Sequence, residues 1–477
     1  MDEWAISLKR LSKILLFSLL MVIAWQRQAA GYSVLTHEQL IDLAWKNSIV
    51  PLLLSHYPNL TPAQLDEARA YAYGGCVIQD IGYYPFGDAS FSDLTHYVRT
   101  GDFVVNLFRN AQNANEMAFA VGALSHYIGD SVGHALATNR AVPIEFPKLG
   151  ARYGTVVNYA EGEHQHVQTE FAFDIDQIAH HRFAPLRFLR HIGLQVPTKQ
   201  LALAYYQTYG LSEDFSSRRG RRFNVRDYRF AVRTLIPRIA YSITLLHRRK
   251  EPPEPDSPAF AEMVAQVAAV NQENNWDAYR RKAGLGTYAL AGLLFVLPKI
   301  GPLKMVAVKG PTTATEGDYL QSIVVSHTIL RRVLERFTPP GENAASGHAP
   351  PMPAALLPIL AATSPDTLLR SNDPRHPLPN RDLDTGSVVQ PGGYRLTDST
   401  FALLLHRLVQ QPTQPIPPGI KTEIQAYYAN PDAPIATKKD PAKWAQVQAD
   451  LKTLADMPTS TEPEPYPTYG DDAANSQ

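Results

Sequence analysis

The sequence predicts an all-α protein in which a multi-helical domain is followed by an extra helical C-terminal region. Long segments carry apolar residues at the three- and four-residue spacing of a helix, and the alternating runs typical of strands are scarce. The chain has 477 residues, of which 45% are hydrophobic, so it can bury a sizeable core. A chain of this length is expected to contain two or three units.

We predict that the multi-helical domain covers residues 32–250. Its clearest helical segments are EQLIDLAWKNSIVPLLL (38–54), NEMAFAVGALSHYIGDSVGHALAT (115–138) and VRDYRFAVRTLIPRIAYSITLLHRR (225–249), the last interrupted at Pro237. Between the first two lies a run rich in Gly and aromatic residues, 74–103, which is long for a connection without regular structure. We expect this run to form a wall of a functional site.

A Pro-rich break at 251–258 separates this domain from the second half of the chain. There we expect a helical block over 259–337, a Pro-rich linker or irregular segment over 338–395, a small helical region over 396–458 and a disordered tail over 459–477. The helical block contains an apolar segment, 287–308, that Pro, Gly and Lys residues interrupt. Two interpretations stay open for it: a buried helical hairpin, or a membrane-dipping element with Lys299 and Lys304 at lipid headgroups.

Residues 1–31 have the pattern of a secretory signal peptide. A basic start precedes the apolar run 14–25, which is shorter than the ~20 residues of a membrane-spanning helix. Small residues at 29 and 31 favour cleavage after Gly31, so the mature chain would begin at Tyr32. Cleavage after Ala30 and retention as an uncleaved anchor are the alternatives. The body of the protein is therefore expected to be exported, to the periplasm, the cell envelope or the medium.

Charge and cysteine content restrict the classes of function. Lys+Arg and Asp+Glu both number 45, so the formal net charge is zero and no stable nucleic-acid partner is expected. One basic cluster, at positions 218, 219, 221 and 222, fits either a solvated loop or a phosphate site. Cys76 is the only cysteine, which excludes a cysteine-based zinc site. Any metal must be held by His, Asp or Glu.

The helical segment ALSHYIGDSVGHALATN (123–139) carries three polar side chains on one apolar helix. His126, Asp130 and His134 are spaced by four residues, so they share a face of the helix. A buried carboxylate without a partner costs several kcal/mol, and either a hydrogen-bonded core cluster or a metal would remove that cost. His nitrogen and Asp oxygen are ordinary ligands of zinc.

Further candidate ligands occur elsewhere in the first 170 residues. His166 and Glu170, in HQHVQTE, again stand four residues apart in a helical segment. Asp80 and His96 lie in the Tyr- and Gly-rich run. Each also has an ordinary structural explanation, because an Asp before a turn usually caps it and a single buried His is usually satisfied by hydrogen bonds. His37 lies five residues after Tyr32, whose α-amine and carbonyl could chelate a metal after cleavage.

Taken in order, these residues resemble the zinc-dependent phospholipase C and P1-type nuclease superfamily, and within it the bacterial zinc-dependent phospholipase C-like branch. The resemblance covers roughly residues 31–185 and includes the HYIGD core at 126–130. It implies a helical fold, three zinc ions per chain and an activity on phosphodiesters. The ligands it implies are Asp80, His96, His126 and Asp130 for one zinc, His134, His166 and Glu170 for a second, and the Tyr32 terminus, His37 and a bridging Asp130 for a third.

The sequence departs from the pattern of the family at His134. The family usually places this histidine five or six residues after the Asp and shortly after a Pro, whereas here the spacing is four and Gly133 precedes it. The second zinc could therefore sit slightly differently. The usual N-terminal Trp is replaced by Tyr or Gly, which matters less because backbone atoms chelate the metal.

The chemistry that the resemblance implies is hydrolysis of a phosphodiester by zinc-activated water, with Asp80 as the catalytic residue that orients or deprotonates it. A phospholipid substrate, with contact at a membrane surface, is favoured by the interrupted apolar segment and by the absence of a basic stripe. Aromatic residues between the ligands could cage a quaternary ammonium or stack on a base: Tyr83, Tyr84, Phe86, Phe91 and Tyr97. The alternatives are a P1-type nuclease acting on single-stranded nucleic acid and a non-catalytic, zinc-stabilised envelope protein.

Overall fold

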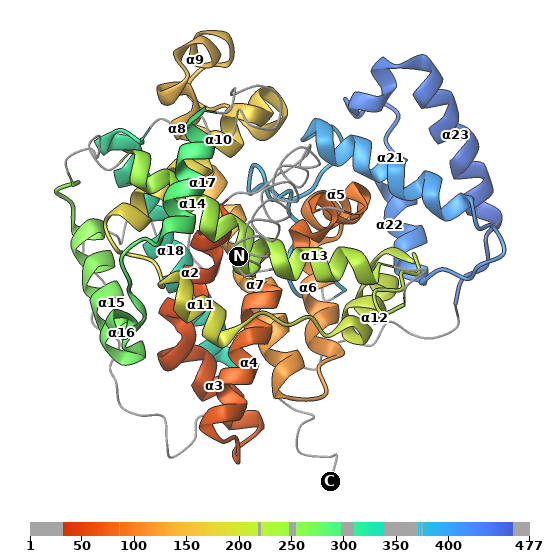
Figure 1. Cartoon of the computed structure of the whole chain (residues 1–477). Coiled ribbons are helices and arrows are strands. Elements are labelled where there is room, and N and C mark those ends of the chain that lie inside the picture. The colour runs from red at the N-terminus through yellow and green to blue at the C-terminus, as the bar shows by residue number, and fades with distance from the viewer. Residues whose placement is uncertain are drawn as a thin grey trace, which may run out of the picture.

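The computed structural model describes residues 32–84, 86–217, 221–247, 254–296, 310–337, 371, 373 and 375–460. Within these ranges the chain is helical, and strand-like pairing is limited to two isolated bridges, Arg381 with Val388 and Ile416 with Thr459 (Figure 1). The prediction of an all-α fold is confirmed. The predicted signal peptide, Arg218 and Arg219, both Lys299 and Lys304, and the tail after Ser460 lie outside the described residues.

The first half of the chain forms short to medium helices around one long central helix. In chain order they are α2 (Val34–Ala44), α3 (Val50–His56), α4 (Pro62–Gly75), α5 (Ala89–Tyr97), α6 (Thr100–Arg109), α7 (Ala114–Gly133), α8 (Asn139–Glu145), α9 (Pro147–Tyr153), α10 (Tyr159–Ala179), α11 (Leu186–Ile192) and α12 (Thr198–Tyr209). Short 3-10 and π-helical turns join some of them: η1 (Trp45–Ile49), η2 (Ile78–Tyr83) and η3 (His134–Thr138).

The second half continues with helices that pack onto this centre. They are α13 (Arg222–Phe230), η4 (Ala231–Leu235), α14 (Ile236–His247), α15 (Pro258–Asn274), α16 (Trp276–Tyr279), α17 (Leu285–Val296), α18 (Thr313–Phe337), α21 (Arg395–Val409), α22 (Pro418–Tyr428), η7 (Ala436–Lys439) and α23 (Pro441–Asp456). The described helices include none that is long and apolar enough to cross a membrane.

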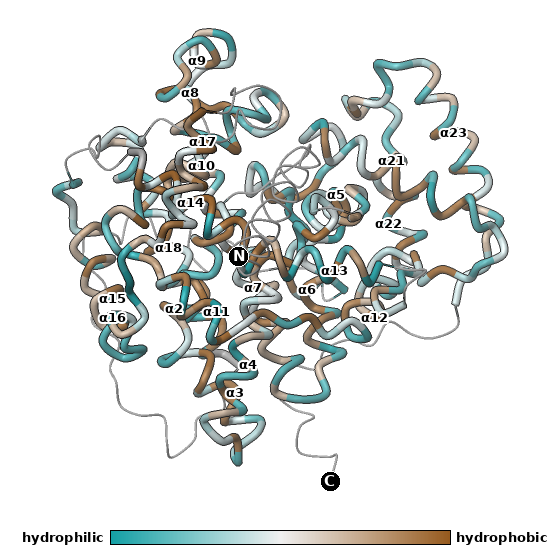
Figure 2. The backbone as a smooth tube through the Cα atoms, in the orientation of Figure 1, coloured by the Kyte–Doolittle hydropathy of each residue, from teal (hydrophilic) through white to brown (hydrophobic). Residues whose placement is uncertain are grey.

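Helix α7 lies at the centre of the molecule and is buried along nearly its whole length. It packs against α4 and α6 from the first half and against α18 from the second half (Figure 1). One continuous hydrophobic core extends from Tyr32 to Met457. Outer helices have one polar face, as the alternation of teal and brown along α23 in Figure 2 illustrates. Residues on both sides of the boundaries predicted at 250, 337 and 395 contribute to this core, and the boundaries stay predictions.

The helix starts follow local chemistry in the sequence. Thr61 and Gln64 form a reciprocal capping box at α4, and the side chains of Asn113, Ser257 and Asp440 cap α7, α15 and α23. These caps satisfy backbone N–H groups that have no partner inside the helix.

Three π-helical turns interrupt otherwise continuous helices, and each lies shortly before a proline. The turns η1, η3 and η4 precede Pro51, Pro143 and Pro237, respectively. Proline lacks an N–H donor and its ring clashes with the carbonyl four residues earlier, so a widened turn lets the helix continue. The interruption predicted at Pro237 is therefore a local widening between α13 and α14. The turn at η3 begins at His134, one of the predicted ligands.

Two predicted segments differ from expectation in extent. The described part of the predicted linker, residues 375–395, is irregular, but it packs into the core through Leu378, Leu383 and Tyr394. The C-terminal region continues to Ser460, because Ser460 and Ile416 pair through their backbones, so the first two residues of the predicted tail are ordered.

Candidate metal centre

The predicted ligand side chains converge into three adjoining groups, although they come from distant elements. Each group brings at least three potential ligand atoms within 4.8 Å of one another: His37, His126 and Asp130; Asp80, His96 and His126; and His134, His166 and Glu170. All of these side chains are buried, and Asp80 is the most exposed of them, at 5%. The structure thus brings together every side chain that the resemblance named as a ligand.

Asp130, on α7, joins the first two groups. Its Oδ1 lies 3.2 Å from His37 Nε2, and its Oδ2 lies 3.1 Å from His126 Nε2 and 3.5 Å from His96 Nε2. Asp80 Oδ1 lies 3.3 Å from His96 Nε2. A carboxylate with both oxygens directed at histidines is suited to bridge two ions, which is the role that the resemblance implies for Asp130.

The third group begins at His134, one helical turn after Asp130. His166 Nδ1 lies 2.8 Å from Glu170 Oε1, and His134 Nε2 lies 3.6 Å from the same oxygen. His134 therefore reaches His166 and Glu170 despite its four-residue spacing from Asp130. The backbone forms a π-helical turn from His134 to Thr138, and the group is complete.

Tyr32 lies beside these groups. Its ring contacts His37 edge-on, with 5.7 Å between the ring centroids, and its hydroxyl donates a hydrogen bond of 2.7 Å to Ser322 Oγ on α18. The ring also presses against Gly133, where a Cβ would stand 2.4 Å from a ring carbon of Tyr32. Ligation by a terminal amine at Tyr32 depends on cleavage of the preceding segment and stays a prediction.

The histidine rings are oriented by acceptors outside the groups. Ser92 O lies 2.7 Å from Nδ1 of His96, Cys76 O lies 3.0 Å from Nδ1 of His126, and Leu383 O lies 2.5 Å from Nδ1 of His134. A carbonyl accepts the Nδ1 proton, so the Nε2 lone pair of each ring faces its group. Histidines that bind metals typically have one ring nitrogen held by a hydrogen bond, here Nδ1, and the other, here Nε2, directed at the metal.

Several buried polar atoms in the groups have no hydrogen-bond partner among the described residues. They are both ring nitrogens of His37, Nε2 of His134 and Oδ1 of Asp80. An unsatisfied buried polar atom costs about 1–3 kcal/mol. Zinc would remove this cost, because imidazole nitrogen and carboxylate oxygen are its ligands. The residues present therefore fit the metal.

The pKa shifts of these side chains show how closely their charges interact. Burial, together with His126, lowers the pKa of His37, whereas burial raises the pKa of Glu170 to about 8. Burial also opposes ionisation of Asp130, but the facing histidines hold its pKa well below the ordinary range. For His134, burial is outweighed by Glu170 and Asp384, which raise its pKa to about 9. Burial and the neighbouring charges thus act in opposite directions on these side chains.

The aromatic residues that the sequence singled out separate into two sets. Tyr83 and Tyr97 lie next to His96, at centroid distances of 5.9 Å and 6.1 Å. Tyr84 packs on Tyr228, Phe91 stacks on Tyr205 in the core, and Phe86 is exposed. Only Tyr83 and Tyr97 of this set adjoin the metal centre.

Sequence reasoning missed the contribution of residues 378–389, which we call the strap. Leu383 in the strap contacts His134 directly, and Asp384 is linked to His166 through Asn139. Tyr394, just beyond the strap, donates a hydrogen bond of 2.7 Å to Asp384. These residues lie about 250 positions after His134 and have no local motif. Nothing in their spacing could have indicated the contact.

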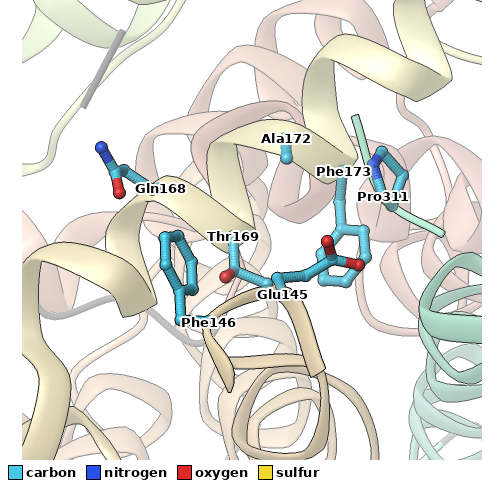
Figure 3. Close-up of a pocket in the computed structure, with 7 residues that line it drawn as sticks. All are labelled: Glu145, Phe146, Gln168, Thr169, Ala172, Phe173 and Pro311. Atoms are coloured by element: carbon cyan, nitrogen blue, oxygen red, sulfur yellow. The ribbon is translucent and has the colours of Figure 1, made fainter. Parts of the chain in front are cut away.

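The structure also contains a pocket beside α10. Figure 3 shows its lining side chains, which come from α8, α10 and the region of Pro311: Glu145, Phe146, Gln168, Thr169, Ala172, Phe173 and Pro311. The carboxylate of Glu145 is already engaged by Thr312 and Thr315. None of the predicted ligands lines this pocket.

Comparison with known proteins identifies the region that holds the three groups. Residues 36–212 match the family model described as zinc dependent phospholipase C. The region of the three groups is therefore similar to that family. We call the matched region the zinc-dependent phospholipase C domain after that model; it contains His37 through Glu170, and the matched family implies zinc and hydrolase chemistry. No curated protein and no solved structure matches the chain. The strap and helices α13 to α23 lie beyond the matched residues.

Proposed function

We propose that this protein is an exported, zinc-dependent phosphodiesterase of the phospholipase C type that binds three zinc ions. The observation that carries the proposal is the convergence of three buried His/Asp/Glu groups inside the zinc-dependent phospholipase C domain. Asp80, His96, His126 and Asp130 would hold one ion; His134, His166 and Glu170 a second; and His37, Asp130 and the mature N-terminus at Tyr32 a third. Zinc, when bound, supplies an activated water and binds phosphate oxygens.

Asp80 is the residue that we assign to the attacking water. Its carboxylate is the most exposed of the predicted ligands, and its Oδ1 has no hydrogen-bond partner among the described residues. It follows α4 on the 3-10 turn η2, whose backbone is anchored by Thr95 Oγ1, which donates to Gln79 O at 3.1 Å. A fixed carboxylate at the centre can orient a water and accept its proton.

Other groups around the centre orient the histidine rings and keep water away from them. Asp130 aligns three histidines, and carbonyl acceptors set the tautomer of His96 and His126. The apolar surroundings on α7 exclude bulk water, which strengthens each electrostatic interaction with a phosphate.

A phospholipid surface is the substrate environment that we infer. Helix α17, the described part of the apolar segment 287–308, exposes Leu285, Tyr288, Phe295 and Val296. Burial, followed by repulsion from Arg238, Arg233 and Arg187, lowers the pKa of Arg190, so these four arginines form one basic group. Arg238 reaches the start of α17 at Gly286. Exposed apolar residues beside basic ones are typical of helices that lie on membranes.

The test of the activity uses the exported, N-terminally sequenced protein with phosphatidylcholine vesicles. We expect release of phosphocholine, loss of release after chelation and recovery with added zinc. A mature N-terminus at Tyr32 supports the third site. Hydrolysis of single-stranded nucleic acid in place of lipid would favour the P1-type nuclease, and three bound zinc ions without any hydrolysis would favour a zinc-stabilised envelope protein.

The membrane surface is tested separately by vesicle sedimentation. We expect Leu285→Ser with Phe295→Ser to reduce binding to anionic vesicles several-fold, because each removes exposed apolar area. Leu203→Ser, an exposed leucine on α12, is the matched control and should leave binding unchanged. Equal binding by all three proteins would argue against α17 as the contact.

A further inference from the structure

The strap crosses the zinc-dependent phospholipase C domain although it lies far beyond it in sequence. Thr100 Oγ1 donates to Arg381 O at 2.8 Å, and Tyr127 on α7 donates to Pro379 O at 2.7 Å. The N–H of Leu383 donates to the carbonyl of His96 at 2.9 Å. The strap is therefore fixed to the same elements that carry the predicted ligands.

Two backbone carbonyls of the strap fix the orientation of the histidine rings in the third group. Leu383 O accepts from His134 Nδ1 at 2.5 Å. Asp384 O accepts from Asn139 Nδ2 at 2.7 Å, and the Oδ1 of Asn139 lies 2.8 Å from His166 Nε2. Because the amide nitrogen of Asn139 is engaged by the strap, its oxygen is left to accept the Nε2 proton of His166. Both histidines therefore keep their remaining ring nitrogen for the group that includes Glu170.

The carboxylate of Asp384 is buried at this point, with 0% exposure. Its Oδ2 accepts hydrogen bonds from the hydroxyls of Tyr97, at 3.0 Å, and Tyr394, at 2.7 Å. Its Oδ1 has no hydrogen-bond partner among the described residues. Burial raises the pKa of Asp384, although His134, the Tyr394 hydroxyl and His96 act in the opposite direction. A buried carboxylate with one free oxygen thus stands beside the third group.

We propose that Asp384 is a further acidic member of the third group and stabilises the zinc ion held by His134, His166 and Glu170. The proposal rests on the proposed function, since it needs zinc at that group. Two neutral histidines and one carboxylate leave a bound dication with a net positive charge, which is costly to bury. Asp384 supplies the second negative charge from outside the family domain, and Tyr97 and Tyr394 position it.

The experiment measures zinc in the full exported chain and two variants from the same strap. Asp384→Asn keeps the shape of the side chain and removes its charge. Asp382→Asn is the matched control, because the Asp382 carboxylate is satisfied within the strap by the N–H and hydroxyl of Thr385, at 2.7 Å and 2.6 Å. Zinc per chain, zinc affinity by chelator competition and the rise in Tm on zinc addition are recorded for each protein.

We expect Asp384→Asn to lower the affinity for one of the three zinc ions by about 10-fold or more. Mutation of residues that support metal ligands commonly has an effect of this size. The zinc-dependent rise in Tm should shrink in Asp384→Asn and stay at the wild-type value in Asp382→Asn. A purely structural role would lower Tm equally with and without zinc. Equal zinc affinity in Asp384→Asn and wild type overturns the proposal, even if the enzyme is an active phosphodiesterase.

A second pair of variants tests the placement of the strap. Gly386 has a φ of 71°, and a Cβ there would stand 2.3 Å from Ser131 O on α7. Gly386→Ala should therefore displace the strap and lower the affinity for the same zinc ion. Gly154, with a φ of 97°, has nothing within 4 Å of a Cβ, so Gly154→Ala carries similar backbone strain without the clash and should keep all zinc. Zinc retention by Gly386→Ala would contradict the proposal. If zinc binding depends on Asp384 but the wild-type protein hydrolyses no phosphodiester, only the proposed function is contradicted.

Discussion

At the scale of single residues, the candidate centre depends on side chains that belong to two groups at once. His126 contributes to the groups of His37 and Asp80, and its Nε2 lies 3.1 Å from Asp130. Asp130 directs each of its oxygens at a different set of histidines. A shared residue couples the groups, so its loss is expected to affect more than one ion.

We therefore predict that His126→Ala loses at least one zinc ion per chain and reduces hydrolysis at least 100-fold, while the helices persist. Helix α7 keeps its apolar contacts with α4 and α18, so circular dichroism should show an unchanged helical content. Metal analysis of the purified variant measures the zinc. His56→Ala, at an exposed histidine, is the control and should keep full zinc content. Full zinc in His126→Ala would show that this residue is not a ligand.

The contact between Tyr32 and Gly133 provides a second prediction. Gly133→Ala places a Cβ against the ring of Tyr32, so we expect a loss of about 1–3 kcal/mol in the free energy of unfolding. Gly292→Ala, at an exposed helical glycine of α17 with nothing within 4 Å, should be neutral or stabilising by up to about 1 kcal/mol. Denaturant titration of both variants measures the difference. Equal stability would mean that the Tyr32 ring moves away freely.

The sequence predicted some of the ligand residues from local spacing and the others, His37, Asp80 and His96, from the order of the whole set. The four-residue spacings at 126, 130 and 134 and at 166 and 170 follow from helix geometry, and the order of the residues supplied the family resemblance. Asp384 and Leu383 carry no such signal, because they meet the centre through backbone carbonyls brought from a distant segment. Binding of zinc by any of these residues stays a prediction.

At the scale of elements, the strap shows how an irregular segment is held without regular hydrogen bonding. His376 lies shortly before it and pairs with Asp102 on α6, with 2.8 Å between Nδ1 and Oδ2. Asn380 donates to the same oxygen at 3.1 Å, and Arg99 also contacts Asp102, at 3.0 Å. The start of the strap is therefore anchored by a partly buried ion pair. Glu423 contacts Arg99 on the other side.

The stability of this anchor should depend on pH. Burial opposes the charge on His376, but Asp102 raises its pKa, whereas burial of Asp102 is outweighed by Arg99 and His376, which lower its pKa. A histidine with a raised pKa stabilises the folded state below its ordinary pKa of about 6.5, and this contribution is lost as the pH rises through the raised value. Asp102 stays ionised throughout this window, because its lowered pKa lies below about 3.9.

We accordingly predict that His376→Gln lowers Tm most at about pH 6 and least well above the raised pKa of His376. Thermal unfolding of wild type and variant across this range measures the difference. His406→Gln is the comparison, because His406 also pairs with a carboxylate, Asp450 at 3.0 Å, but is 45% exposed and distant from the strap in sequence. A Tm difference for His376→Gln that is constant with pH would contradict the ion-pair anchor.

At the scale of the whole molecule, the two halves of the chain share one core. Helix α18 of the second half packs on α7 and α2, and its Ser322 and Tyr319 contact Tyr32 and Thr36 beside the metal centre. The periodicity of the sequence predicted that both segments are helical, but it could not predict that they touch, because helical spacing identifies an apolar face and not its partner. The Pro-rich breaks therefore suggested separate units where the structure has a continuous interior.

This shared core places the metal centre between segments that are distant in sequence, so zinc should stabilise the whole fold. Without an ion, the groups retain buried histidine nitrogens that have no hydrogen-bond partner among the described residues, and closely spaced carboxylates such as Asp80 and Asp130. An ion present at about 1,000 times its Kd adds about 4 kcal/mol to the free energy of unfolding. We expect chelation to lower Tm by many degrees and zinc, in excess over chelator, to restore it.

Calorimetry of the full chain with and without a chelator measures this effect. If the halves are coupled through the centre, a single transition should shift as a whole on removal of zinc, because α18 and the strap both contact the ligand-bearing elements. Two transitions, of which only one responds to zinc, would show instead that the second half unfolds independently. Calcium added in place of zinc is the control. It should not restore Tm, because calcium prefers oxygen ligands and these groups are rich in imidazole.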